Sequence, residues 1–501
     1  MSSTTTMAAN QSSAVNPQLE SRLAQVPLEI LLRITSHITT PDLGNVRLSC
    51  RALERSLFNS FAHEFFRKKQ FMATTDSLQA LIDISKHPTL SPVLKHVILS
   101  VDRPFIPSYP LWNLSNSDRN SEARARLELA KADQMHLLVT GGLRDMLAEA
   151  FANLANLEIV DIRDFNSPSR SRDGPGTQWT SWGAKTLSRL ANTTVQPRLE
   201  GDDDPYTSQI FAAAVAGLAV AQARPKSLEV PIRGRGYAAL ALHDTAFYIP
   251  PRIEGPVSSL LANLKTLHLT LDLTHPKRMR FFMLQRFLSR TINLTWLRLN
   301  FTLKSQPQDQ EELLLWLALK DSKTPVAPFD AGPIQLAHLE RLDLGTVVLE
   351  PRVILGLASK FAPTLRSLYL RQVSLQEYEN ARRRPEDLVN PWKRCLTELS
   401  RIRGLSLRVL DLSSILVGWD RQRCGVSFKV SDDSTAQNWT CSTDKISLEK
   451  AVAKAIEAMV VEWPRQSELQ PMDEDDSEGE EDEDDQETSD EEEEGEDEED
   501  N

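Results

Sequence analysis

The sequence predicts an α/β protein: a helical unit near the N-terminus, then a long irregular solenoid of strands and helices, then a disordered acidic tail. Three observations predict this: amphipathic helices within residues 21–70, a leucine pattern that recurs between residues 157 and 412, and a block of acids at the end of the chain. The 501 residues suffice for a large core, and 41% hydrophobic with 25% charged residues is typical of globular chains. We expect four segments, namely 1–20 (disordered), 21–70 (three helices), 71–465 (solenoid) and 466–501 (disordered, acidic).

The first helix of the unit is predicted to start at Pro27. Proline lacks only an N–H that has no partner at that position, and Glu29 places a carboxylate in the first turn. This helix is expected to reach about Ile38, and Thr-Pro-Asp at 40–42 predicts the start of a second helix, capped by the threonine. Apolar side chains cover roughly 200° of the first helix, about twice the width that one core needs. The excess predicts a contact with a second protein.

The stretch from Val26 to Leu53 resembles the F-box. The matching residues are Val-Pro-Leu-Glu-Ile-Leu at 26–31, Ile34, Asp-Leu at 42–43 and Leu-Ser-Cys-Arg at 48–51. In that family, a three-helix module inserts its apolar face into a Skp-type adaptor, which links it to a cullin-based ubiquitin ligase. Val26 replaces the usual leucine, and Leu53 stands where an aromatic residue often follows the arginine. By position, the resemblance implies adaptor contact for Val26, Pro27, Ile30, Leu31, Ile34, Leu43, Val46 and Leu48; the alternative is an ordinary amphipathic helical hairpin.

The next part of the chain, up to residue 190, is similar to F-box proteins of filamentous fungi, for example in ISKHPTLSPVLKHV at 84–97. The aromatic and basic stretch at 61–71, FAHEFFRKKQF, has the residue types that bind nucleic acid, but we interpret its aromatics as core and its bases as a solvated edge. A first strand is expected at 94–99, a loop at 104–118, and helix from 120 to 153 with a break at Gly141-Gly142.

A leucine pattern, L-x-x-L-x-L, then recurs along the chain. Its members are Leu264-Leu267-Leu269, Leu294-Leu297-Leu299, Leu339-Leu342-Leu344, Leu365-Leu368-Leu370 and Leu407-Leu410-Leu412, with a variant at Leu157-Val160-Ile162. The pattern resembles the strand of leucine-rich repeats, whose alternating leucines enter a core that neighbouring repeats complete. Helix-like segments lie between the strands at 278–289, 311–320 and 352–360. The first leucines are 30, 45, 26 and 42 residues apart, so the solenoid is irregular; the alternative is a generic α/β domain.

The end of the chain is expected to carry a polar segment at 418–444, an amphipathic helix at 446–463 and then the acidic run. Residues 473–500 contain 22 acids and no bases, so this block repels itself and is predicted to be disordered. Without these acids the net charge changes from −13 to about +9. Ser477, Thr488 and Ser489 each have an acid three residues on, which makes them possible phosphorylation sites.

No catalytic motif is complete. His63-Glu64 begins a zinc-protease motif, but Arg67 occupies the place of the second histidine, and the isolated pair His243-Asp244 is interpreted as a surface pair. The four cysteines have no CxxC spacing, so we expect reduced thiols, no metal site and no cofactor. No apolar run is long enough for a membrane span, and the N-terminus has no secretory signal. An intracellular, cytoplasmic or nuclear protein that is not an enzyme and has no membrane or nucleic-acid partner is expected.

The two resemblances together imply the substrate receptor of a Skp-cullin-F-box ubiquitin ligase. The helical unit is expected to bind the Skp-type adaptor, and through it a cullin, while the repeat domain binds a protein substrate that the sequence does not identify. Two alternatives remain: a noncatalytic nuclear scaffold that binds basic proteins such as histones through the acidic tail, and an enzyme whose cleft no sequence motif reveals.

Overall fold

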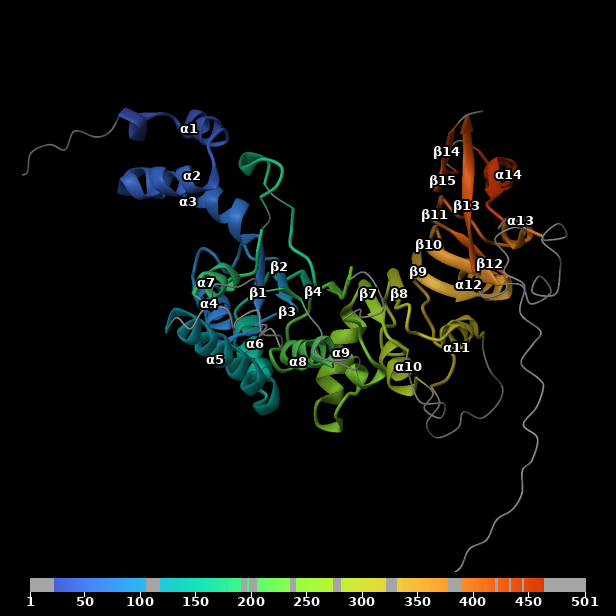
Figure 1. Cartoon of the computed structure of the whole chain (residues 1–501), viewed down its shortest axis with the longest axis horizontal. Helices are drawn as coiled ribbons and strands as arrows, with labels where there is room; N and C mark the ends of the chain where they lie inside the picture. Colours follow the sequence, from blue (N-terminus) through green and yellow to red (C-terminus); the bar gives the residue numbers. More distant parts are fainter. Residues whose placement is uncertain are drawn as a thin grey trace, which may run out of the picture.

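The computed structural model describes residues 22–104, 118–168, 170–177, 179–190, 196–197, 205–234, 240–273, 281–320, 331–376, 389–419, 422–431, 434–443 and 446–463. The fold is mixed α/β with one large, mostly parallel sheet, which confirms the predicted class. Its strands follow one another along the inner side of an arc, and helices cover the outer side (Figure 1). The predicted tails, with Ser477, Thr488 and Ser489, and most of the predicted loop at 104–118 lie outside the described residues.

The parallel part of the sheet runs in the order β1-β2-β4-β6-β7-β8-β9-β10. These strands are Lys68–Met72, His96–Ser100, Ile159–Arg163, Ser227–Glu229, Thr266–Leu271, Trp296–Phe301, Arg341–Leu349 and Ser367–Gln376. Next, β11 (Val409–Ser413) pairs with the first half of β10, and β12 (Leu416–Trp419) pairs with its second half. Every leucine motif of the sequence therefore contributes a strand. A separate pair is formed by β3 (Asp102–Arg103) and β5 (Gln196–Pro197).

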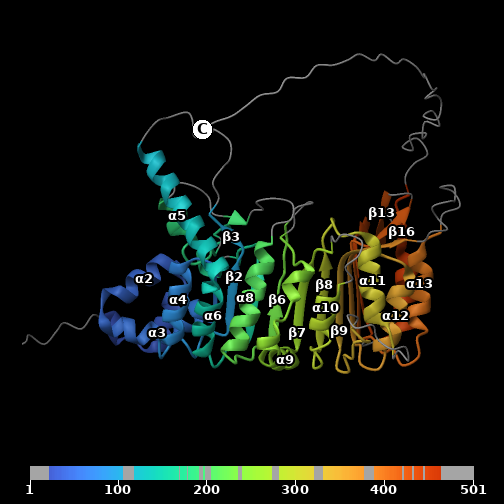
Figure 2. The same cartoon turned by 90° about the horizontal axis from the view of Figure 1, so that it is seen from below.

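The helices form the outer layer and an N-terminal unit. The N-terminal helices are α1 (Leu28–Thr35), α2 (Thr40–Ser49) and α3 (Arg51–Phe66), after the short turn η1 (Arg22–Gln25). The others are α4 (Thr75–Lys86), α5 (Asp118–Thr140), α6 (Gly142–Ala152), α7 (Ala184–Leu190), α8 (Tyr206–Val220), α9 (Glu254–Asn263), α10 (Phe282–Leu288), α11 (Pro307–Ala318), α12 (Pro351–Phe361), α13 (Pro391–Ser400) and α14 (Leu448–Ala458). Figure 2 shows α6, α8, α10, α11 and α13 side by side in chain order, with α5 leaning away from this row.

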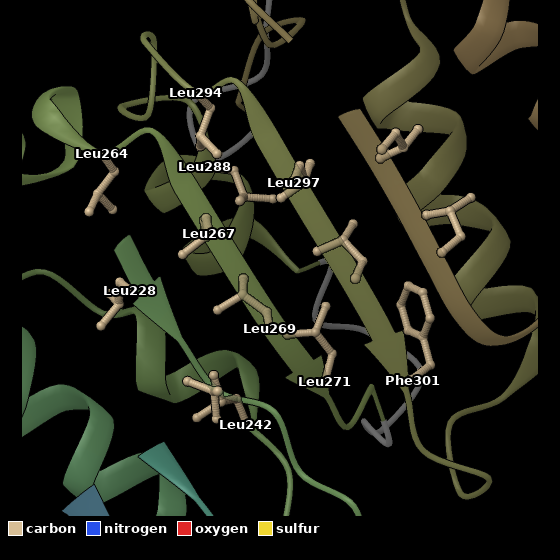
Figure 3. Packing of buried hydrophobic residues seen from close by; sticks show 14 of the residues in the cluster. Leu228, Leu242, Leu264, Leu267, Leu269, Leu271, Leu288, Leu294, Leu297 and Phe301 are labelled. Carbon is tan, nitrogen blue, oxygen red and sulfur yellow. The ribbon is translucent and has the colours of Figure 1, made fainter. Parts of the chain in front are cut away.

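The main core lies between the sheet and the outer helices. The motif leucines of β7 and β8 point into it together with Leu288 of α10 (Figure 3). Leu267, Leu269, Leu297 and Leu299 are each 0% exposed, as expected where side chains alternate between the two faces of a strand. Because the same positions recur in each strand, the leucines stack into one continuous core.

Three neighbouring strands share an unusual backbone kink on the inner side of the arc. Thr346, Gln372 and Ser414 have φ values of 54°, 53° and 50°, in the left-handed region that non-glycine residues rarely adopt. They follow Gly345, Arg371 and Ser413, which are in register across β9, β10 and β11. The kinks therefore form a ladder, and beyond it β9 continues to Leu349 and β10 to Gln376.

Several boundaries differ from the sequence predictions. The segment at 418–444 was expected to be merely polar, but it contains the antiparallel strands β13 (Gln422–Ser431), β14 (Ser434–Ala436) and β15 (Asn438–Ser442). The predicted helix at 446–463 is wrong in length, because α14 ends at Ala458 and β16 (Met459–Val461) pairs with β13. Helix α1 ends at Thr35 instead of Ile38, and the side chain of Thr39, not Thr40, caps α2. The break at Gly141 is confirmed, with a φ of 79°.

Candidate functional site

The N-terminal helices have a small core of their own at the β1 end of the arc (Figure 1). We call residues 22–67 the helical unit. Its core contains Leu31 of α1, Leu43 of α2, and Leu53, Leu57 and Phe65 of α3. Leu32 of α1 is half-buried against the same core, whereas the other apolar side chains of α1, Leu28, Ile30 and Ile34, are exposed.

The residues predicted for adaptor contact divide into three groups. Ile30 and Ile34 are 50% and 45% exposed, Leu48 is 84% exposed, and Pro27 is also exposed. Leu31 and Leu43 belong to the core of the unit, so in this conformation they support the surface without forming it. Val26 and Val46 are half-buried against the same core. Ile30 and Ile34 lie one turn apart on α1 and form a half-exposed apolar stripe, which we call the docking stripe.

The helical unit is attached to the sheet by a second contact besides the chain itself. The connection between β4 and α7 reaches the unit through the short turn η3 (Ser171–Asp173). The guanidinium of Arg172 donates to both carboxylate oxygens of Glu64, at 2.6 and 2.7 Å, and to the carbonyls of Thr35 and Ile38, at 2.8 and 3.1 Å. The carboxylate of Asp173 accepts from the N–H and the hydroxyl of Thr40 at 2.8 and 2.7 Å.

Aromatic side chains reinforce this junction. The guanidinium of Arg170 lies between the rings of Phe65 and Trp179, at 4.1 Å from each centroid. The ammonium of Lys69 on β1 faces Trp179 at 5.6 Å and Trp182 at 5.1 Å. Burial, together with the nearby charge of Arg170, lowers the pKa of Lys69 to about 8. The aromatic and basic stretch at 61–71 is thus used within the protein at these positions.

The inner face of the sheet carries the side chains that alternate with the leucines. Strand register places Asp161, Glu229, His268, Arg298, Asp343, Tyr369 and Asp411 in one row across the sheet. We call these seven residues the inner row. They occupy the middle x of each L-x-L motif, so the alternation of the sequence already contains them. A row rich in charged and aromatic side chains on a concave face is a candidate binding surface.

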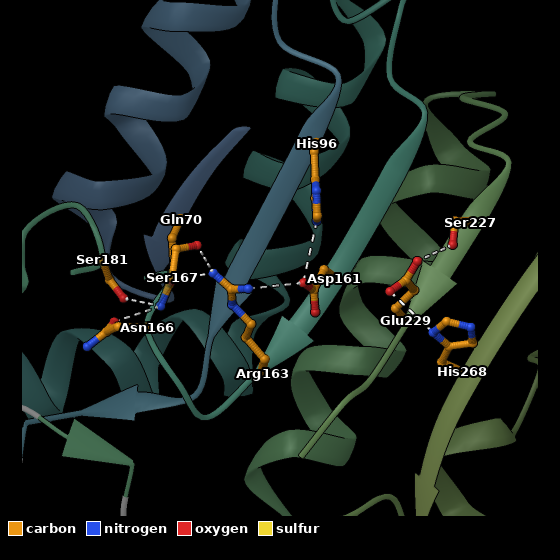
Figure 4. A network of polar contacts seen from close by, with 10 residues as sticks. All are labelled: Gln70, His96, Asp161, Arg163, Asn166, Ser167, Ser181, Ser227, Glu229 and His268. Atoms are coloured by element: carbon orange, nitrogen blue, oxygen red, sulfur yellow. Dashed lines mark hydrogen bonds and ion pairs between the residues drawn. The ribbon is translucent and has the colours of Figure 1, made fainter. Parts of the chain in front are cut away.

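At the β1 end, the inner face is a closed polar network (Figure 4). The guanidinium of Arg163 donates to Gln70 Oε1 at 2.8 Å and to Ser167 Oγ at 2.6 Å, and it lies 3.7 Å from Asp161. His96 Nε2 is 3.4 Å from the same carboxylate. Burial lowers the pKa of Arg163, while the charge of Asp161 opposes that shift. The second terminal nitrogen of Arg163 is thus bound within the protein, whereas Arg163 Nε, His96 Nε2 and Asp161 Oδ1 are buried without a hydrogen-bond partner in the described structure.

The next part of the row is a histidine and carboxylate pair. His268 Nδ1 lies 3.3 Å from Glu229 Oε2, and the hydroxyl of Ser227 donates to Glu229 Oε1 at 2.6 Å. Burial alone raises the pKa of Glu229, but the hydrogen bond and charge of His268 and the bond from Ser227 lower it to about 2. The ring of His268 meets that of Trp296 edge to face at 4.3 Å.

The centre of the inner face carries arginines. The guanidinium of Arg341 is sandwiched between Trp296 and Tyr369, at 4.0 and 3.9 Å, and donates to both oxygens of Asp343 at 2.7 and 2.9 Å. Arg298, one strand away, is half-buried, and its hydrogen bond to Asn300 Oδ1 is long at 3.5 Å. Burial lowers the pKa of Arg298, and its arginine neighbours lower it further, while Asp343 opposes them.

The two sequence pairs with possible catalytic chemistry, His63-Glu64 and His243-Asp244, each have a carboxylate that is used in a structural contact. Within the described parts of the chain, no three His, Cys, Asp or Glu side chains are grouped to hold a metal ion. The expectation that His243-Asp244 is a surface pair is wrong for the aspartate, which is 4% exposed and accepts the N–H of Leu284 at 2.9 Å. Glu64 of the incomplete zinc-protease motif binds Arg172 instead.

Two further findings concern the whole chain. No helix among the described residues is long and apolar enough to cross a membrane. Neither a scan against models of known protein families nor a search of curated proteins finds a match for this chain. The docking stripe, the inner row and the motifs of the sequence are therefore the features that bear on function.

Proposed function

We propose that this chain is the substrate-recognition subunit of a Skp-cullin-F-box ubiquitin ligase. The observation that carries the proposal is the docking stripe: Ile30 and Ile34 are half-exposed on a helical unit that has its own core. An apolar stripe of this kind is a common means by which a helix binds a partner protein. The resemblance of residues 26–53 to the F-box identifies the partner as a Skp-type adaptor.

The repeat domain supplies the second half of the proposal. Its motifs resemble leucine-rich repeats. This resemblance is supported by the position of the motifs, because each leucine triplet forms a strand of one curved sheet with helices outside it. A target protein would bind on the inner face, while the adaptor holds the helical unit. No side chain of this chain reacts in such an assembly; its contribution is to hold the target close to the ubiquitin-conjugating enzyme.

The test is capture of a purified Skp-type adaptor by the full chain. The variant Ile30→Asp with Ile34→Asp places two carboxylates in the docking stripe, and burying a charge without a partner costs several kcal/mol. We expect this variant to lose capture. Both positions are half-exposed, so the free protein tolerates the change.

A matched control is available on another helix. Leu129 and Val139 of α5 are 70% and 77% exposed, and replacing both with aspartate adds the same two charges away from the helical unit. The control is expected to capture the adaptor like the unchanged chain. Equal capture by the docking-stripe variant, or no capture by the folded, unchanged chain, would contradict the proposal.

A further inference from the structure

The centre of the inner face has more positive than negative side chains. Arg233, which follows β6, acts electrostatically on Arg298, as do Arg341 and Arg371. Arg233 has its own acid, Asp164, and between β8 and β10 Asp343 is the acid beside Arg298, Arg341 and Arg371, so the arginines there exceed it by two; Asp411 lies on the next strand, β11. Such an excess on a concave face attracts anions.

Both acids are already engaged within the protein. Asp343 accepts two hydrogen bonds from Arg341. Asp411 accepts from the hydroxyl of Ser413 on one oxygen and from that of Thr440 on the other, both at 2.7 Å. Because the carboxylates of Asp343 and Asp411 already accept these hydrogen bonds, they are not strong acceptors for the other arginines.

Between β8 and β10, Arg298 and Arg371 have no hydrogen bond or ion pair to a carboxylate in the described structure, whereas Arg341 has Asp343. Arg298 makes only its long bond to Asn300, and Arg371 is exposed. Next to Arg298 on β8, the buried Nε1 of Trp296 has no hydrogen-bond acceptor in the described structure. This nitrogen is closed to solvent, so the guanidinium groups of Arg298 and Arg371 are the donors that a ligand can reach.

The spacing of the donors indicates the form of the ligand. Arg298 is on β8 and Arg371 on β10, two strands across and two residues further along, so their Cα atoms are about 12 Å apart. Separate charges at that spacing suit several carboxylates distributed along an extended chain, whose alternate side chains are about 7 Å apart. A single compact dianion would neutralise only part of this surface.

We propose that the inner face between β8 and β10 binds an acidic, aspartate- and glutamate-rich segment of the target protein, with Arg298 and Arg371 as its main charge partners. This inference rests on the proposed function for the identity of the target, but its chemistry is independent of the docking stripe. The rings of Trp296 and Tyr369 hold Arg341 in place beside the site, and Arg341 donates two hydrogen bonds to Asp343.

The test measures binding of a fluorescent octaglutamate peptide to the full chain by anisotropy. The test variant combines Arg298→Gln and Arg371→Gln. The control variant combines Arg224→Gln and Arg252→Gln, and it removes two exposed arginines that flank α8 and α9 and lie away from the inner row. We expect the first pair to raise the Kd about tenfold or more, because it removes both charge partners of the site, and the second pair to leave the Kd nearly unchanged, because it removes the same charge elsewhere. Thermal melts establish that each variant is folded.

The acidic run of the chain itself can compete with the peptide. A second form of the full chain, with Asn and Gln in place of the Asp and Glu residues at 473–500, removes this competitor. The proposal is supported if either form of the chain binds octaglutamate and the Arg298 and Arg371 variant of that form does not. Failure of the neutral-tail form to bind octaglutamate overturns it, as does tighter binding of a neutral peptide with one phosphoserine. Adaptor capture is measured separately, so the two proposals fail independently.

Discussion

Replacing Arg172 with alanine is expected to loosen the helical unit while leaving the sheet folded. Arg172 binds the carbonyls of Thr35 and Ile38, which lie at and just beyond the C-terminal end of α1, where backbone acceptors have no partner within the helix. A cation at this end also suits the negative pole of the helix. The same guanidinium forms a two-point contact with Glu64 on α3.

The size of the effect follows from these contacts. A hydrogen bond to a charged group contributes about 1.5–3 kcal/mol when it is buried. The Glu64 side chain is 30% exposed, so solvent reduces its share, and the freed carbonyls regain water. We expect about 3 kcal/mol in total, which raises the fraction of time that α1 is open about 100-fold.

Hydrogen exchange followed by mass spectrometry measures this opening directly. Peptides from α1 should exchange about 100 times faster in Arg172→Ala, whereas peptides from β8 should keep their rate. Arg189→Ala, which removes an exposed arginine on α7, is the control and should change neither. Unchanged exchange in α1 would refute the reasoning, and equal acceleration in β8 would show a global loss of stability instead.

Three further predictions concern the sheet. The free energy of unfolding in urea should be lower by about 3 kcal/mol in Glu229→Gln than in the unchanged chain near neutral pH. The folded pKa of Glu229 is about 2, below the ordinary value of 4.5. The difference should therefore be complete above pH 4.5 and should vanish as the pH falls from 4.5 towards 2. Gln372→Gly should stabilise by about 0.5–1 kcal/mol because it relieves a φ of 53°, whereas Gln372→Val should destabilise. Leu299→Ala should lower the free energy of unfolding by about 3 kcal/mol because Leu299 is 0% exposed. Urea midpoints measure the Gln372 and Leu299 variants. A more stable Gln372→Val, or no loss of stability in Leu299→Ala, would contradict these predictions.

The parallel strands could be predicted because their signal is local. In each L-x-x-L-x-L motif the leucines repeat every second residue, and burial on one face follows from that period. Strand β6 gave too short a signal, with three residues, and β1 was hidden because Lys68–Met72 continues an aromatic and basic stretch. The strands at 422–442 were missed since one face of an antiparallel edge can be polar throughout.

The candidate sites were predictable to different degrees. The helical period identified an excess apolar surface on α1, but it could not decide that Leu31 faces the core and Ile30 faces outward, because both lie within the same broad arc. The inner row could have been read from the residues between the motif leucines. Arg172 carried no signal, because its connection is rich in Pro and Gly without periodicity, and its partners are more than 100 residues away in sequence.

The two attachments of the helical unit have a joint consequence for its orientation. Helix α3 ends at Phe66 and β1 starts at Lys68, so one residue joins the unit to the sheet. Near this joint, Ala62, Phe58 and Phe66 of α3 pack against the main core and limit rotation of the unit. The contact of Arg172 and Asp173 with α1, α2 and α3 adds a second point away from that joint. Since Ser167 of the same connection binds Arg163 in the network on the inner face, the direction of the docking stripe is tied to the inner row through hydrogen-bonded groups.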